Sequence, residues 1–143
     1  NDWELWCLGT GDIDPVCHPK IKHFGFVQPN EMKKIISETG IFVLPSRFEP
    51  WGVVLHEFAA AGFPLICSDE VGAAETFLHE NQNGFIFKAK DVEGLKLVMK
   101  KMISHSDEKI FDMGVKSNIL AQQITPEKWT KTIRSIIQTN VRN

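Results

Sequence analysis

Cysteine is scarce in this chain of 143 residues, and its scarcity excludes two classes of small domain. Only Cys7, Cys17 and Cys67 occur, and no two of them form a CxxC pair. An odd, sparse set of this kind supports neither a disulfide framework nor a zinc knuckle. We therefore predict reduced thiols, with Cys7 and Cys67 buried.

Long hydrophobic runs, internal repeats and Pro/Gly/Ser-rich linkers are also missing. No stretch reaches the ~18 consecutive apolar residues of a membrane span, and residues 1–4 lack the basic start of a signal peptide. Hydrophobic residues make up 43% and charged residues 24%, which is near the globular average and argues against a disordered or fibrous chain. We expect one cytoplasmic globular domain over residues 1–143, since ~100 to 200 residues is the usual domain size.

The charge of the chain is unevenly distributed. Five Lys or Arg and twelve Asp or Glu residues occur up to Phe87, whereas eleven and six occur from Lys88 onward. The basic second part predicts lysines on the solvent faces of amphipathic helices, and peripheral contact with the inner face of a membrane is the open alternative. Aromatic and basic residues do not interleave, so we expect no nucleic-acid partner.

Short apolar runs bounded by Gly, Pro or Asp alternate with stretches of helical period. This alternation is typical of βα units that form a parallel sheet, so the predicted fold class is α/β. Most of the apolar runs are continuous, as strands covered on both faces require. The predicted strands are residues 4–8, 22–26, 41–44, 65–68 and 84–87.

The helices have recognisable first residues. Asn30 and Asp91 are predicted caps of amphipathic helices between and after the strands. Ser106 begins a predicted helix that ends near Gln122, and Pro126 at the first helical position follows Thr125 in a last one. An α-helical tail from about residue 105 to 143 is therefore expected to close the domain.

Two glycine-containing loops after predicted strands leave their roles open. Residues 9–12 contain a lone GxG, which fits a tight strand exit as well as a ligand contact. Residues 69–75 place Gly72 between a strand and a helix. There it could leave room for a sugar or phosphate, or could form a plain turn.

The loop and helix over residues 45–64 are more informative. Gly52 lies at or near a predicted helix start, so the amides of Gly52, Val53 and Val54 can reach a phosphate. Glu57 lies roughly 7 Å further along the axis at ~1.5 Å per residue, about the span from a diphosphate to its ribose. Glu49 would lie on the other side of the phosphate. This spacing suits a nucleotide sugar, although a capping glycine beside stabilising acids gives the same pattern.

Several motifs together resemble the retaining GT-B glycosyltransferases of family 4 (glycosyl transferases group 1) and the bacterial glycogen synthases. The run from Glu49 to Glu57 resembles their E-x7-E motif. The resemblance covers roughly residues 5–102. Its flanking motifs are Phe24-Gly25-Phe26-Val27, Val43-Leu44-Pro45-Ser46, the run Ala59, Ala61, Gly62 and Pro64, then Glu75, and Asn83-Gly84-Phe85.

This resemblance implies the C-terminal, Rossmann-like donor domain of a GT-B enzyme. It implies that Glu49 holds hydroxyls of the donor sugar as the catalytic residue and that Glu57 holds the ribose. A UDP-, GDP- or ADP-sugar would be the donor, a glycan or lipid the acceptor, and no metal or other cofactor is expected. The implied donor-binding residues are Phe26, Val27, Arg47, Trp51, Gly52, Val53, Val54 and Glu57, with Phe26 and Val27 lining the base pocket.

The chain departs from the family pattern at its beginning. The family's Arg and Lys that clamp the diphosphate precede the first strand, and here only three residues do. Asn1 is not an initiator Met, so we expect a piece of a longer protein without its N-terminal acceptor domain, with trimming of a short leader as the alternative. The segment between Gly11 and Ile21 is short where the family has a helix. We expect the piece alone to be inactive.

Other functions of the same fold and two reactive side chains are alternatives to this interpretation. A non-catalytic nucleotide-sugar-binding or assembly subunit of the GT-B fold is the main alternative, and phosphorolysis or sugar epimerisation on the same fold is a further one. His56 points about 100° away from Glu57 by helical period, and Cys67 lies in an apolar strand. We interpret both as structural.

Overall fold

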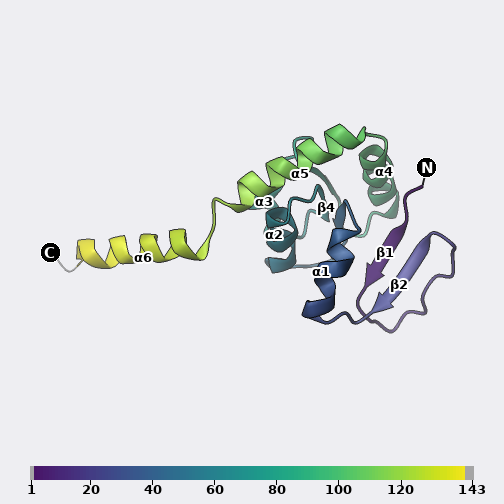
Figure 1. Ribbon diagram of the computed structural model, residues 1–143, viewed down its shortest axis with the longest axis horizontal. Coiled ribbons are helices and arrows are strands. Elements are labelled where there is room, and N and C mark those ends of the chain that lie inside the picture. The colour runs from purple at the N-terminus through teal and green to yellow at the C-terminus, as the bar shows by residue number, and fades with distance from the viewer. Residues whose placement is uncertain (1, 141–143) are drawn as a thin grey trace. The chain divides into compact units, whose positions relative to one another are not determined.

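A computed structural model describes residues 2–140 (Figure 1). The chain divides into two compact units, Asn1–Thr39 and Gly40–Asn143, and each is described by itself. The single domain predicted for residues 1–143 stays a prediction.

The first unit consists of a parallel strand pair and one helix. Strands β1 (Leu5–Leu8) and β2 (Ile21–Gly25) pair in parallel, and helix α1 (Pro29–Ser37) follows. The Gly9 amide donates to the Gly25 carbonyl at 2.7 Å, so this glycine forms a tight strand exit. Residues 9–20, which connect the strands, are exposed and contain no helix.

The prediction that Asn30 caps α1 was wrong. Gln28, and not Asn30, is the extended residue before the helix, and Pro29 occupies the first helical position. The fixed φ of proline suits that position, and its missing N–H would have no partner there anyway. The Gln28 amide instead donates to the Glu31 carboxylate at 3.4 Å.

The second unit contains a three-stranded parallel sheet in the order β3-β4-β5. Its strands are β3 (Phe42–Leu44), β4 (Leu65–Ser68) and β5 (Gly84–Phe87). All four residues of the central strand β4 are buried, as expected for a strand paired on both sides. The predicted α/β arrangement with parallel strands is confirmed, with β1 and β2 paired in the first unit and β3, β4 and β5 in the second.

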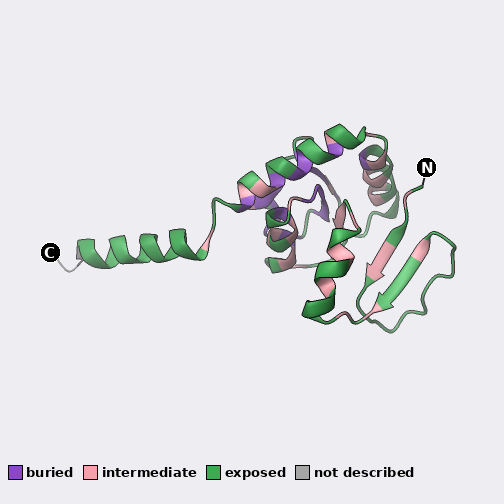
Figure 2. Ribbon diagram, in the orientation of Figure 1, coloured by how far each residue is buried: buried purple, intermediate pink, exposed green. Residues whose placement is uncertain are grey.

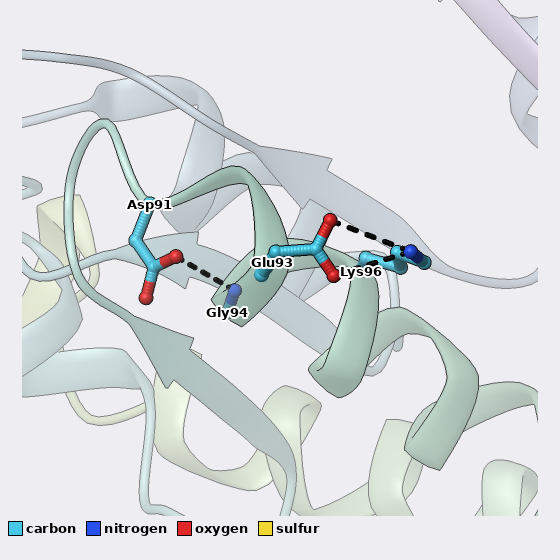
Figure 3. A network of polar contacts seen from close by, with 4 residues as sticks. All are labelled: Asp91, Glu93, Gly94 and Lys96. Carbon is cyan, nitrogen blue, oxygen red and sulfur yellow. Dashed lines mark hydrogen bonds and ion pairs between the residues drawn. The ribbon is translucent and has the colours of Figure 1, made fainter.

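Among residues 40–140, the second unit also contains the helices α2 (Val53–Ala60), α3 (Ala74–Phe77), α4 (Val92–Ile103), α5 (Asp107–Ala121) and α6 (Pro126–Asn140). The predicted caps of the last three are confirmed. Figure 3 shows the start of α4, where the Asp91 carboxylate accepts from the Gly94 amide at 2.9 Å and Glu93 pairs with Lys96. Ser106 and Thr125 accept in the same way from Lys109 and Lys128, each at 3.3 Å.

The core of the second unit lies around β4, β5 and the inner faces of α4 and α5 (Figure 2). Its central buried residues are Ile66, Phe85, Phe87, Met102 and Met113. Helix α6 was expected to close the domain, but its apolar side chains Trp129, Ile133, Ile136 and Ile137 are exposed.

Helix α5 packs closely on α2. A Cβ added at Gly114 would lie 2.1 Å from the Gly62 carbonyl oxygen, so these two backbones touch. The Asn118 amide group donates to the Ala60 carbonyl at 2.6 Å. Gly62 has φ +85° and follows Ala61, the C-cap residue of α2, a place where glycine is common.

The cysteines differ in burial. Cys67 on β4 is fully buried, as predicted, and burial raises the pKa of its thiol to about 12. The prediction for Cys7 was wrong, because this residue is only half-buried. Its unit offers little cover, since α1 contributes no buried residue.

Candidate functional site

Two loops at the carboxyl ends of β3 and β4 pair with each other through their backbones. The Glu49 amide donates to the Glu70 carbonyl at 3.0 Å, and the Glu49 carbonyl accepts from Gly72 at 3.1 Å. The Ala73 amide then donates to the Trp51 carbonyl at 2.7 Å. Parallel pairing thus continues past the sheet, and a bridge between Glu49 and Val71 marks its extension.

Gly72 permits this close approach. A Cβ at this position would lie 2.3 Å from the Pro50 carbonyl oxygen, well inside any real contact. The sequence left the role of Gly72 open between a ligand contact and a plain turn. The structure shows a third role, which is to let the two loops pack backbone against backbone.

Helix α2 begins directly after this paired segment. Gly52 is its N-cap residue with φ +89°, and a Cβ there would lie 3.1 Å from both Glu49 Cγ and Val71 Cγ1. Within residues 2–140, no side chain caps this helix. The first amides of a helix have no intrahelical partner and carry the positive end of its dipole. The predicted helix start at Gly52 is therefore confirmed.

Side chains of different exposure surround this helix start. Glu49 is half-buried, whereas Glu57 on α2 is exposed. Arg47 is exposed, the Trp51 side chain is 46% exposed, and Val53 is 60% exposed. The helix start offers amides that can bind an anion, and Glu49 and Glu57 are carboxylates that can accept hydrogen bonds from hydroxyl groups.

The part of the chain that the structure describes contains no cluster of three or more His, Cys, Asp or Glu residues that could hold a metal ion. Among the same residues, no helix is both long and apolar enough to cross a membrane.

The family of glycosyl transferases group 1 matches residues 17–118. That range includes both paired loops and all of α2. The chain belongs to this family.

Relatives of this glycosyl transferases group 1 chain are themselves glycosyltransferases. It is 30% identical to an uncharacterized glycosyltransferase of Methanocaldococcus jannaschii, and the match covers 71% of this chain and 28% of that protein. The chain thus spans less than a third of the length of this relative.

Solved structures share the fold of this chain. One is HepE from Anabaena in complex with UDP-glucose, with a TM-score of 0.67 and 19% identity over 82% of this chain and 33% of that one. Another is the C-terminal domain of a glycosyl transferase group 1 family protein from Francisella tularensis, with a TM-score of 0.63 and 20% identity over 73% and 53% of the two chains. The α/β fold is that of the GT-B glycosyltransferases, as predicted.

Most candidate residues of this family member lie on one segment. Arg47, Glu49, Trp51, Gly52, Val53, Val54 and Glu57 follow β3 on the paired loop and on α2. Phe26 and Val27 lie in the first unit, directly after β2, and Phe26 is 70% exposed. Their place at a base pocket stays a prediction.

Sequence reasoning missed the partners that hold the Glu49 loop. Val71 is 2% exposed and pairs with Glu49, and Gly72 hydrogen-bonds it. The signal in the sequence was Gly72, which is followed by small residues and comes after a buried strand. This pattern did not indicate which other segment would pack against the glycine.

Proposed function

We propose that this chain is the donor-binding domain of a retaining glycosyltransferase, which transfers a sugar from a nucleotide diphosphate sugar to a glycan or lipid hydroxyl. The observation that carries the proposal is the uncapped start of α2 at Gly52, with Glu49 held beside it by the Gly72 loop. The first amides of α2 have no intrahelical partner, and Glu49 and Glu57 supply carboxylates before and after them in the chain. This set of groups fits a diphosphate with a hydroxyl-rich group on each side.

Each residue then has one role. The amides of Gly52, Val53 and Val54 hold the diphosphate, since a helix N-terminus favours anions. Glu57 accepts hydrogen bonds from the ribose hydroxyls, and Glu49 accepts them from the donor sugar. Arg47 and Trp51 contribute at the rim of the same loop, and the roles of Phe26 and Val27 in the first unit stay a prediction.

The reaction needs no covalent nucleophile from this chain. The bond from the anomeric carbon to the diphosphate oxygen breaks while the acceptor oxygen bonds to the same face of that carbon. The acceptor proton passes to the leaving diphosphate, so anomeric configuration is retained. The helix dipole stabilises the leaving charge in place of a metal ion. Full activity requires an acceptor domain and a cationic diphosphate clamp, which we place in the longer protein.

Calorimetric titration of the chain tests this proposal. UDP, GDP and ADP and their glucose conjugates are titrated without metal and again with excess EDTA. UDP is the first choice because the related HepE was crystallised with UDP-glucose. We expect binding of one base in the millimolar range, unchanged by EDTA.

The Glu57→Ala variant locates the bound nucleotide. Loss of two ribose hydrogen bonds to a charged acceptor should weaken binding at least tenfold, at ~1.5 to 3 kcal/mol for each such bond. Glu93→Ala is the matched control, because Glu93 is an exposed glutamate on α4 that pairs only with Lys96 in the described contacts. Equal affinities for Glu57→Ala and Glu93→Ala would contradict the assignment of the ribose.

A non-catalytic subunit of the same fold would pass the binding test. The longer protein distinguishes the two functions, because an enzyme releases free nucleotide diphosphate in the presence of acceptor and a binding subunit does not. Analysis of the product's anomeric configuration then tests the retaining mechanism. Identification of the product as a glycoside of the acceptor, and not a sugar phosphate or an epimerised sugar, excludes phosphorolysis and epimerisation.

A further inference from the structure

Three side-chain rings, those of Trp51, Phe77 and His56, contact one another in sequence. The His56 ring on α2 stacks on the Phe77 ring with centroids 4.1 Å apart and planes 4° apart. Phe77 also meets the Trp51 ring edge-on, with centroids 6.4 Å apart and an interplanar angle of 79°. Phe77 therefore lies between a helix residue and a residue of the candidate donor loop.

His56 is held by the last residue of α5. Its Nε2 lies 3.2 Å from the Ala121 carbonyl oxygen. A carbonyl oxygen can only accept, so Nε2 carries the hydrogen and donates it. The Ala121 carbonyl also accepts from the Ile124 amide at 3.2 Å. A carbonyl oxygen has two lone pairs, so it can accept both hydrogen bonds. The His56 hydrogen bond joins residues 65 positions apart in the chain and fixes the plane of the imidazole.

The fixed imidazole restricts the positions that the Phe77 and Trp51 rings can take. Phe77 is fully buried, and one of its neighbours is the imidazole that Ala121 holds. Trp51 is nearly half exposed, so buried surroundings alone do not fix its ring. Its backbone carbonyl is held by Ala73, and its ring rests against the edge of Phe77. The position of the Trp51 ring thus depends on the stack beneath it.

We propose that His56 is a positioning residue for the donor site, which acts through Phe77 on Trp51 and so on the loop that precedes Gly52. His56 has no catalytic role in this proposal, and it contacts neither Glu49 nor Glu57 among the described interactions. The effect on Trp51 stands by itself. The effect on donor affinity rests on the function proposed above.

The first measurement needs no ligand. The indole N–H resonance of Trp51 in a ¹⁵N-labelled chain is assigned by its loss in Trp51→Phe, and the other tryptophan resonances serve as internal references. His56→Gln keeps a donor group but loses the ring stack, whereas His56→Phe keeps a ring but loses the hydrogen bond. We expect the Trp51 resonance to move most in His56→Gln and less in His56→Phe.

Asn118→Ala is the matched control. Asn118 also joins α5 to α2 through one side-chain hydrogen bond, to the Ala60 carbonyl at 2.6 Å, but has no ring contact to Phe77. This variant should leave the Trp51 resonance in place even if it lowers thermal stability. The proposal is overturned if the chemical shift of Trp51 is unchanged in both His56 variants. It is also overturned if the shift changes as much in Asn118→Ala as in His56→Gln.

The second measurement is nucleotide affinity. Loss of an aromatic pair of this kind should raise the Kd for the bound nucleotide roughly two- to tenfold in His56→Gln, with no rise in Asn118→Ala. If the wild-type chain binds no nucleotide, the donor-site function fails while the Trp51 resonance still decides whether His56 positions the ring. If nucleotide binds and neither the resonance nor the Kd responds to His56, only the positioning role fails.

Discussion

The backbones of Gly72 and Pro50 are so close that no side chain fits between them. A Cβ on Gly72 would lie 2.3 Å from the Pro50 carbonyl oxygen. The hydrogen bonds of Glu49 with Glu70 and Gly72 depend on this approach, since they lie on the same paired segment. The position of the candidate catalytic carboxylate is thus set by a glycine on the neighbouring loop.

Gly72→Ala should therefore damage both stability and donor binding. The added methyl group must push against backbone, and overpacking of this kind costs roughly 1 to 3 kcal/mol. We expect a lower midpoint in thermal unfolding and a weaker nucleotide affinity by calorimetry. Gly11→Ala is the control, because a Cβ at Gly11 meets nothing within 4 Å. Identical unfolding midpoints for the two variants would show that the Gly72 loop is not tightly packed.

Glu49→Ala should separate catalysis from nucleotide binding. The variant removes the proposed acceptor for the donor sugar's hydroxyls but leaves the amides of α2 and Glu57 in place. In the longer protein we expect turnover to be abolished while affinity for the nucleotide diphosphate stays within about twofold, well below the effect of a lost hydrogen bond to a charged group. Turnover close to that of the unchanged enzyme would refute the role of Glu49.

Cys67 should react very slowly with thiol reagents in the folded chain. With a pKa raised to about 12 by burial, about one thiol in ten thousand is ionised at pH 8, and the thiolate is the reactive form. Iodoacetamide at pH 8 should label the exposed Cys17 quickly and Cys67 only after addition of denaturant. Mass spectrometry of the labelled peptides measures both. Native labelling of Cys67 as fast as that of Cys17 would show that β4 opens readily.

The same pKa predicts a loss of stability at alkaline pH. The folded state holds the Cys67 proton more tightly than the unfolded state, whose thiol has its usual pKa. The stabilising contribution is complete below pH ~9 and is lost as pH rises toward 12. Urea unfolding between pH 8 and 11 should show this decline, and Cys67→Ala should flatten it. A decline that is just as steep in Cys67→Ala would have to come from other groups.

The sequence by itself determined the local features of this protein. The bounds of β4 and β5, the caps Asp91, Ser106 and Thr125, and the helix start at Gly52 all match the structure. Each depends on a few neighbouring residues, such as an apolar run between turn residues or a short polar side chain before a helix. The candidate residues from Arg47 to Glu57 were found for the same reason, because they lie on one continuous segment.

Only the tertiary structure decided which segments meet. Gly72 lies against Pro50, and His56 forms a hydrogen bond to Ala121 across 65 positions. Contacts of this kind depend on how distant segments pack, and no local pattern of residue types records them. The sequence identified Glu49 as a candidate residue, but it did not identify the backbone of Glu70 and Gly72 that holds the Glu49 loop in place.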